Sequence, residues 1–280
     1  MHRCIFGTDK GQPCGSISFE GHADSVRAVG LFKDGLLAGY GLSGSLDQHL
    51  LLWRLSGTAG LECRAALPGA CRCLRILAED GRDARVLATA NLSVVELAVS
   101  AEETSARVTV LKQVVCQVPG ASLAVFLEAP LRECLEMRRW PKSFLSESSL
   151  QVAVGGVDGA LALICGGSCR AMQRLTSEGD IISAVMPIAR HILTVCRDGT
   201  LRMVRWSSLA GLEKLWARSG WRMYVSTIGC QGACRLISDG FDNLIRTFTL
   251  EKTVEAAMDW SDSEDDAENE CAESEESSED

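Results

Sequence analysis

The sequence predicts an all-β protein built from repeated small sheets and followed by a charged segment. Short runs of Val, Leu, Ile and Ala recur along the chain, and Gly, Asp or Ser interrupts them every 8 to 15 residues. Short apolar runs separated by turn residues are typical of antiparallel strands joined by tight turns. Evenly spaced strands also indicate an internal repeat, and the turn residues reveal one.

Five segments share one pattern: a short apolar run, a turn that ends in Asp or Asn, and a second apolar run. The acid or amide of these turns is Asp47, Asn91, Asp158, Asp198 or Asp242. A large apolar residue follows six positions later in each segment, at Trp53, Leu97, Ile164, Val204 and Phe248. Successive turn residues are 44, 67, 40 and 44 positions apart, which defines five units.

A glycine precedes each unit in step with its turn residue. These glycines are Gly21, Gly69, Gly120, Gly179 and Gly220. The third unit is longer than the others by roughly 15 residues, which places an insertion at about residues 129–148. We therefore expect a repeat domain over residues 1–258, in which each unit is a sheet of four strands.

The first unit, residues 20–55, resembles a WD repeat. The residues that carry the resemblance are Gly21, His22, Ser45, Asp47 and Trp53. Arg54 stands where the family usually has Asp, and the later units keep the turn but lose the Gly-His and Trp-Asp pairs. The resemblance covers roughly residues 14–250 and implies a WD-repeat β-propeller with about five recognisable four-stranded blades.

The resemblance also implies a polar network in the first blade. In the WD-repeat family the turn Asp accepts backbone and imidazole hydrogen bonds, and the His is linked through a Ser or Thr to the Trp. The matching residues here are His22, Ser45, Asp47 and Trp53. A buried network of this kind must have all of its polar groups paired. We therefore expect these residues to stabilise the blade rather than to carry out chemistry.

Five blades would form either a closed small ring or an incomplete propeller. The run from Cys14 to Phe19 predicts a lone strand before the first blade. If this strand paired with the last blade, after Leu250, it would close the ring and remove its free edges. The alternative is an open propeller whose missing blades are supplied elsewhere.

The sequence offers few groups for catalysis. It has four His, and it contains no His-Glu-x-x-His, Gly-x-Ser-x-Gly or phosphate-loop motif. The close cysteine pairs are Cys71 with Cys73, Cys165 with Cys169, and Cys230 with Cys234. Structural zinc sites usually use two tighter pairs. We expect no catalytic residues, no cofactor and no metal; a small metalloprotein that uses the paired cysteines is an alternative.

The insertion has the composition of a contact surface. It carries Arg138, Arg139, Trp140, Lys142 and Phe144. These residue types are enriched at the hot spots of protein interfaces, and a long insertion that projects from a blade is suited to binding a partner. The alternative is that Trp140 and Phe144 fold back onto the blade.

The net charge of −9 is concentrated at the C-terminus. Residues 259–280 contain twelve acidic residues and no Lys or Arg, so they carry −12 and residues 1–258 carry +3. Because this segment has so little to bury, we expect a disordered acidic tail that binds basic proteins. Acidic residues follow three positions after Ser261, Ser263 and Ser277, a spacing that resembles sites of acidophilic kinases such as casein kinase 2.

The remaining expectations concern location. No apolar run approaches the roughly 20 residues needed to span a bilayer, so no membrane contact is expected, and no signal peptide is visible. The thirteen cysteines are therefore expected to be reduced, in the nucleus or cytoplasm, with the nucleolus as a further option. Direct nucleic-acid binding is not expected from a nearly neutral body.

Together these features favour a non-catalytic WD-repeat scaffold or adaptor that mediates protein–protein interactions within a multiprotein complex. This functional expectation rests on analogy, because propellers host many functions. The alternative is an accessory subunit of an RNA-modification or RNA-processing enzyme complex, including one of ribosome biogenesis. A basic patch formed by Arg132, Arg138, Arg139 and Lys142 would support that alternative.

Overall fold

The computed structural model of the chain is all-β, as the sequence predicts. It describes residues 2–6, 17–127, 136, 140–176, 180–188, 191–197, 200–207, 211–218, 225–230, 235–240 and 245–249. The predicted site residues outside these ranges are Arg138, Arg139, Asp198, Asp242, Ser261, Ser263 and Ser277. The acidic segment 259–280 also lies outside the described residues.

The first two repeat units each form a four-stranded antiparallel sheet, which confirms the predicted sheet size for these units. The first sheet consists of β3 (Val26–Leu31), β4 (Tyr40–Ser45), β5 (His49–Arg54) and β6 (Gly60–Ala66). The second consists of β7 (Leu74–Glu79), β8 (Asp83–Ala90), β9 (Ser93–Ala101) and β10 (Ala106–Val115). A short 3-10 helix, η1 (Gly35–Gly39), links β3 to β4.

The third and fourth units repeat this arrangement. The third sheet consists of β11 (Gly120–Leu127), β12 (Leu150–Gly156), β13 (Ala160–Cys165) and β14 (Ser168–Arg174). The fourth consists of β15 (Ile182–Ile188), β16 (His191–Cys196), β17 (Leu201–Ser207) and β18 (Gly211–Arg218). The predicted insertion falls between β11 and β12 and contains a second 3-10 helix, η2 (Phe144–Ser146).

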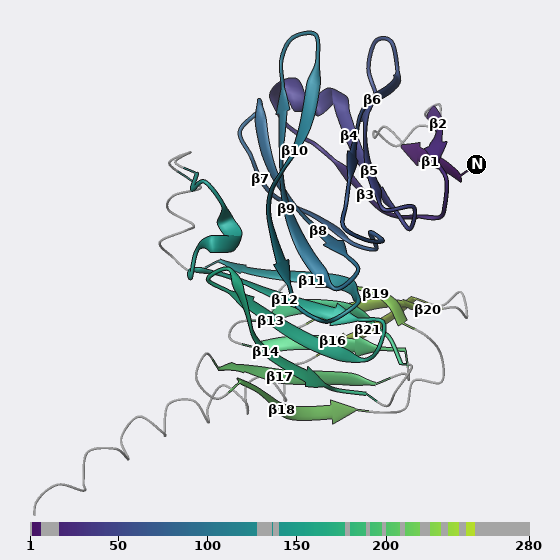
Figure 1. Ribbon diagram of the computed structural model, residues 1–280. Helices are drawn as coiled ribbons and strands as arrows, with labels where there is room; N and C mark the ends of the chain where they lie inside the picture. Colours follow the sequence, from purple (N-terminus) through teal and green to yellow (C-terminus); the bar gives the residue numbers. More distant parts are fainter. Residues whose placement is uncertain are drawn as a thin grey trace, which may run out of the picture.

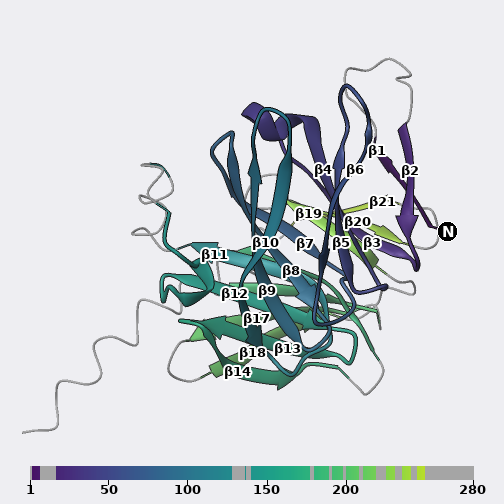
Figure 2. The ribbon, with the colours of Figure 1, turned by 45° about the horizontal axis from the view of Figure 1, so that its top comes forward.

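In the fifth unit the structure describes three strands of an antiparallel sheet, and the residues that follow them lie outside the described ranges. The three strands are β19 (Val225–Cys230), β20 (Arg235–Gly240) and β21 (Ile245–Thr249). Successive sheets lie side by side, and the first strand of one sheet contacts a strand of the next: β3 contacts β7, β11 contacts β15, and β15 contacts β19. The outer strands β6, β10, β14 and β18 also contact one another in sequence. This arrangement is propeller-like (Figures 1 and 2).

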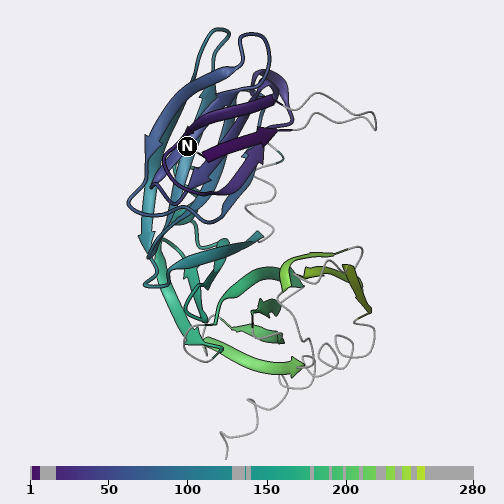
Figure 3. The same ribbon diagram turned by 90° about the vertical axis from the view of Figure 1, so that its right-hand side faces the viewer.

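The strand at the N-terminus does not close a ring among the described residues. The predicted strand is β2 (Ile17–His22), and it pairs with β1 (His2–Phe6) rather than with β21. Figure 3 shows the sheets following a curved path, with β1 and β2 at one end and the fifth sheet at the other. The expectation of a lone strand that completes the last blade is therefore wrong for these residues.

The core lies between successive sheets rather than on one side of each. In β5, Leu50 and Leu52 face the second sheet, whereas Leu51 and Trp53 pack with Phe19 of β2. Because the strands are buried on both faces, they are nearly continuous apolar runs in the sequence. The same alternation occurs in β13, where Ala162 packs toward the second sheet and Leu161 toward the fourth.

The turn repeat read from the sequence corresponds to equivalent places in the fold. Asp47, Asn91 and Asp158 lie in the turn between the second and third strands of the first three sheets. The apolar residue six positions later is buried against the preceding element each time: Trp53 against β2, Leu97 against the first sheet, and Ile164 against the second. The spacing thus records the packing of one sheet on the previous one.

Candidate functional site

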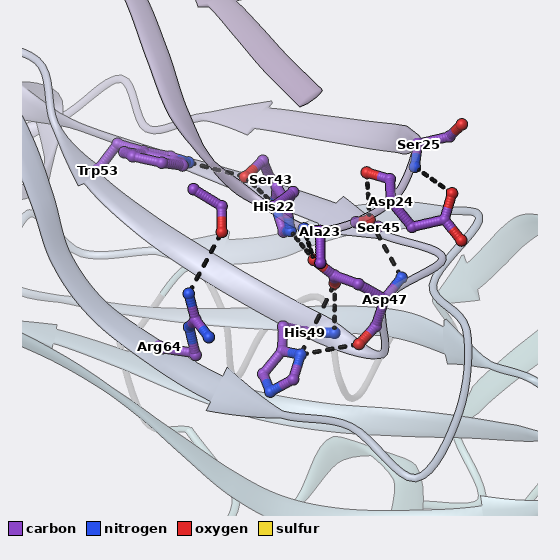
Figure 4. A network of polar contacts seen from close by, with 11 residues as sticks. His22, Ala23, Asp24, Ser25, Ser43, Ser45, Asp47, His49, Trp53 and Arg64 are labelled. Carbon is purple, nitrogen blue, oxygen red and sulfur yellow. Dashed lines mark hydrogen bonds and ion pairs between the residues drawn. The ribbon is translucent and has the colours of Figure 1, made fainter. Parts of the chain in front are cut away.

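A chain of hydrogen bonds runs through the first sheet from Trp53 to the β4–β5 turn (Figure 4). Trp53 Nε1 donates to Ser43 Oγ at 2.7 Å, and Ser43 Oγ lies 2.7 Å from His22 Nε2. His22 Nδ1 lies 2.8 Å from Asp47 Oδ2. An indole N–H can only donate. The Ser43 hydroxyl hydrogen can therefore go to His22 Nε2, and His22 Nδ1–H can then donate to the carboxylate.

The serine in this chain is Ser43, so the assignment of Ser45 was wrong. Residues 43 and 45 share one face of β4, because side chains alternate along a strand. Trp53 pairs with Gly41, and Ser43 is two residues from that pair whereas Ser45 is four. Only Ser43 is thus close enough to bridge the indole and the imidazole.

Ser45 has a separate role in the turn. Its hydroxyl donates to the Asp24 carbonyl at 3.0 Å and accepts from Asp47 N–H at 3.2 Å. Asp47 in turn accepts from Ala23 N–H at 2.8 Å and His49 N–H at 3.0 Å. These bonds join the end of β2 to the β4–β5 turn.

The network is enclosed. His22 and Trp53 are each 2% exposed, and Phe19 packs on the indole with ring centroids 5.0 Å apart. A Cβ placed on Gly21 would lie 2.8 Å from Trp53 Cη2, so glycine is needed there for the close approach of β2. The four groups therefore hold β2 against the first sheet, and a substrate would have to displace packed side chains to reach them.

The carboxyl of Asp47 makes this network sensitive to acid. Burial raises the pKa of Asp47, but the hydrogen bonds from Ala23 N–H, His22 Nδ1–H and His49 N–H outweigh burial and lower this pKa from its ordinary value. A lowered pKa means that the stability contributed by the carboxylate is complete above the unfolded pKa, about 3.9. That contribution is lost as the pH falls through the folded value.

We expect the substitution Asp47→Asn to weaken the pH dependence of stability on the acid side. The wild-type chain should lose part of its unfolding free energy as the pH falls from about 5 to about 2, because Asp47 takes up a proton on unfolding. The variant lacks this proton uptake, so its slope over this window should be shallower, although it is less stable at pH 7. Urea titrations at several pH values measure both slopes, and equal slopes would contradict the assignment.

The two other described turn residues, Asp158 and Asn91, also stabilise their turns. Asp158 Oδ1 accepts from Ala160 N–H at 3.2 Å, which parallels the bond from His49 to Asp47. Asn91 has a φ of 51°, in the left-handed region that Asn tolerates, and its carbonyl accepts from Gly120 N–H at 3.0 Å. These residues therefore shape turns.

The insertion ends by folding back into the core, which contradicts the expectation that Phe144 binds a partner. Phe144 is 0% exposed and Leu145 1%, and both pack with the second and third sheets. Trp140 is half-buried, with its ring 5.3 Å from the Arg85 guanidinium and 6.4 Å from the Phe144 ring. Lys142 is exposed. Two large aromatic rings gain more free energy from burial than from projecting into water.

Glu96 anchors this fold-back, and it is the residue that the sequence reading missed. It lies on β9 and is 0% exposed. Its carboxylate accepts from Ser143 Oγ at 2.6 Å and from the N–H groups of Phe144 and Leu145, each at 3.0 Å. The available signal was its position, since Glu96 interrupts an apolar run in a strand buried on both faces. A charge there requires buried partners.

The paired cysteines lie in packed surroundings. Cys71 is buried and Cys73, Cys165 and Cys169 are half-buried, all with free thiols. Burial raises the pKa of Cys71 to about 12. The Cys71 thiol is therefore a poor nucleophile at neutral pH. Within the described ranges, no three His, Cys, Asp or Glu side chains gather in a way that could hold a metal ion. Cys234 lies outside those ranges.

The outer strands carry an exposed apolar surface, which we call the outer-strand patch. Its members are between 37% and 58% exposed, and they are Leu61 on β6, Val110, Leu111 and Val115 on β10, and Met172 on β14. These strands are the fourth strands of three successive sheets, so they lie at the outer edge of each sheet (Figure 1). Exposed apolar groups on adjacent elements are characteristic of protein-binding surfaces.

Fold and site together define an all-β protein of propeller-like, four-stranded sheets whose central polar network is enclosed and whose outer strands are partly apolar. The chain matches no family model and no curated protein. Among the described residues there is no helix long and apolar enough to cross a membrane.

Proposed function

We propose that the chain is a WD-repeat β-propeller protein that acts as a non-catalytic scaffold and binds other proteins within a larger complex. The resemblance of residues 20–55 to a WD repeat supports the family. The hydrogen-bonded set of His22, Asp47 and Trp53 supports it further, because the resemblance implied a network of this kind. In this proposal the four four-stranded sheets and the sheet of three described strands are the five blades.

The observation that carries the function is the outer-strand patch. Leu61 is 47% exposed on β6 and Leu111 is 37% exposed on β10, and these two strands contact each other. Leaving such side chains in water forgoes the free energy of burial, about 25 cal/mol per Å² of apolar surface. A protein partner that covers the two strands would recover this free energy. The His22 network is already paired internally, which supports a structural rather than a chemical role for it.

The partner and location follow from charge and composition. We propose that the acidic residues 259–280 attract basic proteins, since opposite charges speed encounter and favour the correct partner. We propose that the protein works in a reducing compartment, nucleus or cytoplasm, because the seven cysteines whose side chains are described have free thiols.

We expect the double substitution Leu61→Glu and Leu111→Glu to release the partner without unfolding the protein. The tagged full-length chain should recover its main co-purifying proteins at about one-tenth of the wild-type level or less, as expected when a contact worth ~1.4 kcal/mol or more is lost. Quantitative mass spectrometry of the purified complexes measures this recovery.

The control is Thr109→Glu, which adds one negative charge at an exposed position of β10 without removing a large apolar side chain. Circular dichroism should show that all variants keep the fold of the wild type. Undiminished recovery of every co-purifying protein by the double variant would refute the proposed docking role of these strands.

A further inference from the structure

A surface groove separates the outer strands of the second and third sheets. Val115 at the end of β10 and Met172 on β14 line it, together with Gln117 and Arg170. Val115 is 58% exposed and Met172 54%, so the apolar part of the groove is open to solvent. The strands β10 and β14 contact each other but belong to different sheets, so no ladder of hydrogen bonds fills the space between them.

All charged side chains of β10 and β14 are positive. β10 and β14 contain Arg107, Lys112, Arg170 and Arg174, and neither strand contains Asp or Glu. Asp158 lies 3.8 Å from Arg174 and offsets its charge. Arg170 lines the groove, whereas Arg107 lies at the other end of β10. Lys112 Nζ lies beside Gly167, next to the start of β14, and donates to Ser146 Oγ at 2.8 Å. Cations beside an exposed apolar groove fit an acidic segment with at least one large apolar side chain.

We propose that the groove between β10 and β14 holds the chain's own acidic segment, residues 259–280. This segment carries −12, and its one aromatic residue is Trp260. The carboxylates would lie along Lys112 and Arg170, and the Trp260 ring would cover Val115 and Met172. The proposal goes beyond the scaffold function, because it concerns a contact within one molecule that exists whether or not a partner is present.

The chain supplies a tether for this contact. Residues 250–280 follow the last strand, and Trp260 is eleven residues after Thr249. An extended chain covers at most 3.3–3.6 Å per residue, so Trp260 can reach about 36–40 Å from Thr249. A tethered ligand also has an effective concentration in the millimolar range, so a weak individual contact is sufficient to keep the groove occupied.

Photo-crosslinking of the purified full-length chain tests the proposal. The photoreactive residue p-benzoylphenylalanine replaces Met172 or, in a second variant, Val115; both positions are exposed, so the fold should be kept. No Lys or Arg follows Lys252, so trypsin releases residues 253–280 as one peptide. We expect irradiation of dilute protein to link this peptide to β14 or β10 within a species of monomer mass.

Three comparisons sharpen the result. The same probe at Leu61 on β6, which is 47% exposed, should capture at least tenfold less of the peptide. Arg170→Glu and 0.5 M salt should each reduce capture at Met172. In the unmodified chain, a zero-length carbodiimide reaction should join Lys112 to a carboxylate of residues 259–280.

Capture of other segments only, capture of a second copy at dimer mass, or equal capture at Leu61 would each overturn the proposal. Because the sample contains the purified chain alone, failure here is distinct from failure of the scaffold function. That function is tested on co-purifying proteins and through a different pair of side chains.

Discussion

The substitution Glu96→Ala is expected to destabilise the protein by about 3–5 kcal/mol, the usual result of removing one partner from a buried charged network. Its carboxylate accepts three hydrogen bonds from residues 143–145. Without it, the N–H groups of Phe144 and Leu145 lose their acceptor in a dry environment, and Arg85, whose Nε lies 3.9 Å from Oε1, loses a counter-charge. Urea unfolding measures the loss as a lower midpoint.

Two control variants test whether the effect is specific to the Glu96 carboxylate. Glu96→Gln keeps one acceptor oxygen, so its free energy of unfolding should lie between those of the wild type and the alanine variant. Glu102→Ala, at the exposed β9–β10 turn, should change stability by no more than ~0.5 kcal/mol. If Glu96→Ala proves as mild as Glu102→Ala, Glu96 does not anchor the insertion.

The second large effect is expected for Ser43→Ala. This change removes the bridge between Trp53 Nε1 and His22 Nε2, and both atoms belong to side chains that are 2% exposed. Each of the two buried polar groups left without a partner costs about 1–3 kcal/mol, so the variant should lose ~2–6 kcal/mol of unfolding free energy. Equilibrium urea unfolding at pH 7 provides the measurement, with similar m-values showing that the two-state comparison holds.

Ser45→Ala is the matched control, since it removes the same hydroxyl two residues along the same strand. Its hydroxyl donates to the Asp24 carbonyl in a partly buried turn, so a loss of about 0.5–1.5 kcal/mol is expected. A larger loss of stability for Ser45→Ala than for Ser43→Ala would show that Ser45, not Ser43, bridges Trp53 and His22.

These two predictions mark where the sequence was informative and where it was not. The periodic turn residues and the apolar residue six positions later were readable because both follow from local strand geometry. Ser43 was missed because the choice between two serines on one face depends on cross-strand register with Trp53. Register becomes visible once the β4–β5 hairpin is paired residue by residue.

The burial of the insertion and the pairing of the N-terminal strand depend on contacts between different segments of the chain. Phe144 is buried because Glu96, 48 residues earlier, binds its backbone N–H. β2 pairs with β1 across a connection of ten residues, whereas β21 is more than 200 residues away. The shorter loop costs less entropy to close, which favours the local hairpin. Neither outcome follows from a single-segment pattern.

The central claim is that partners bind the outer strands and that the His22 network is internal structure. Hydrogen-exchange mass spectrometry of the full-length chain, free and within its purified complex, tests this claim most directly. The predicted result is slower exchange in β6 and β10, residues 60–66 and 106–115, with the His22–Ser25 segment and the β4–β5 turn unchanged. Protection confined to that segment and turn would contradict the claim.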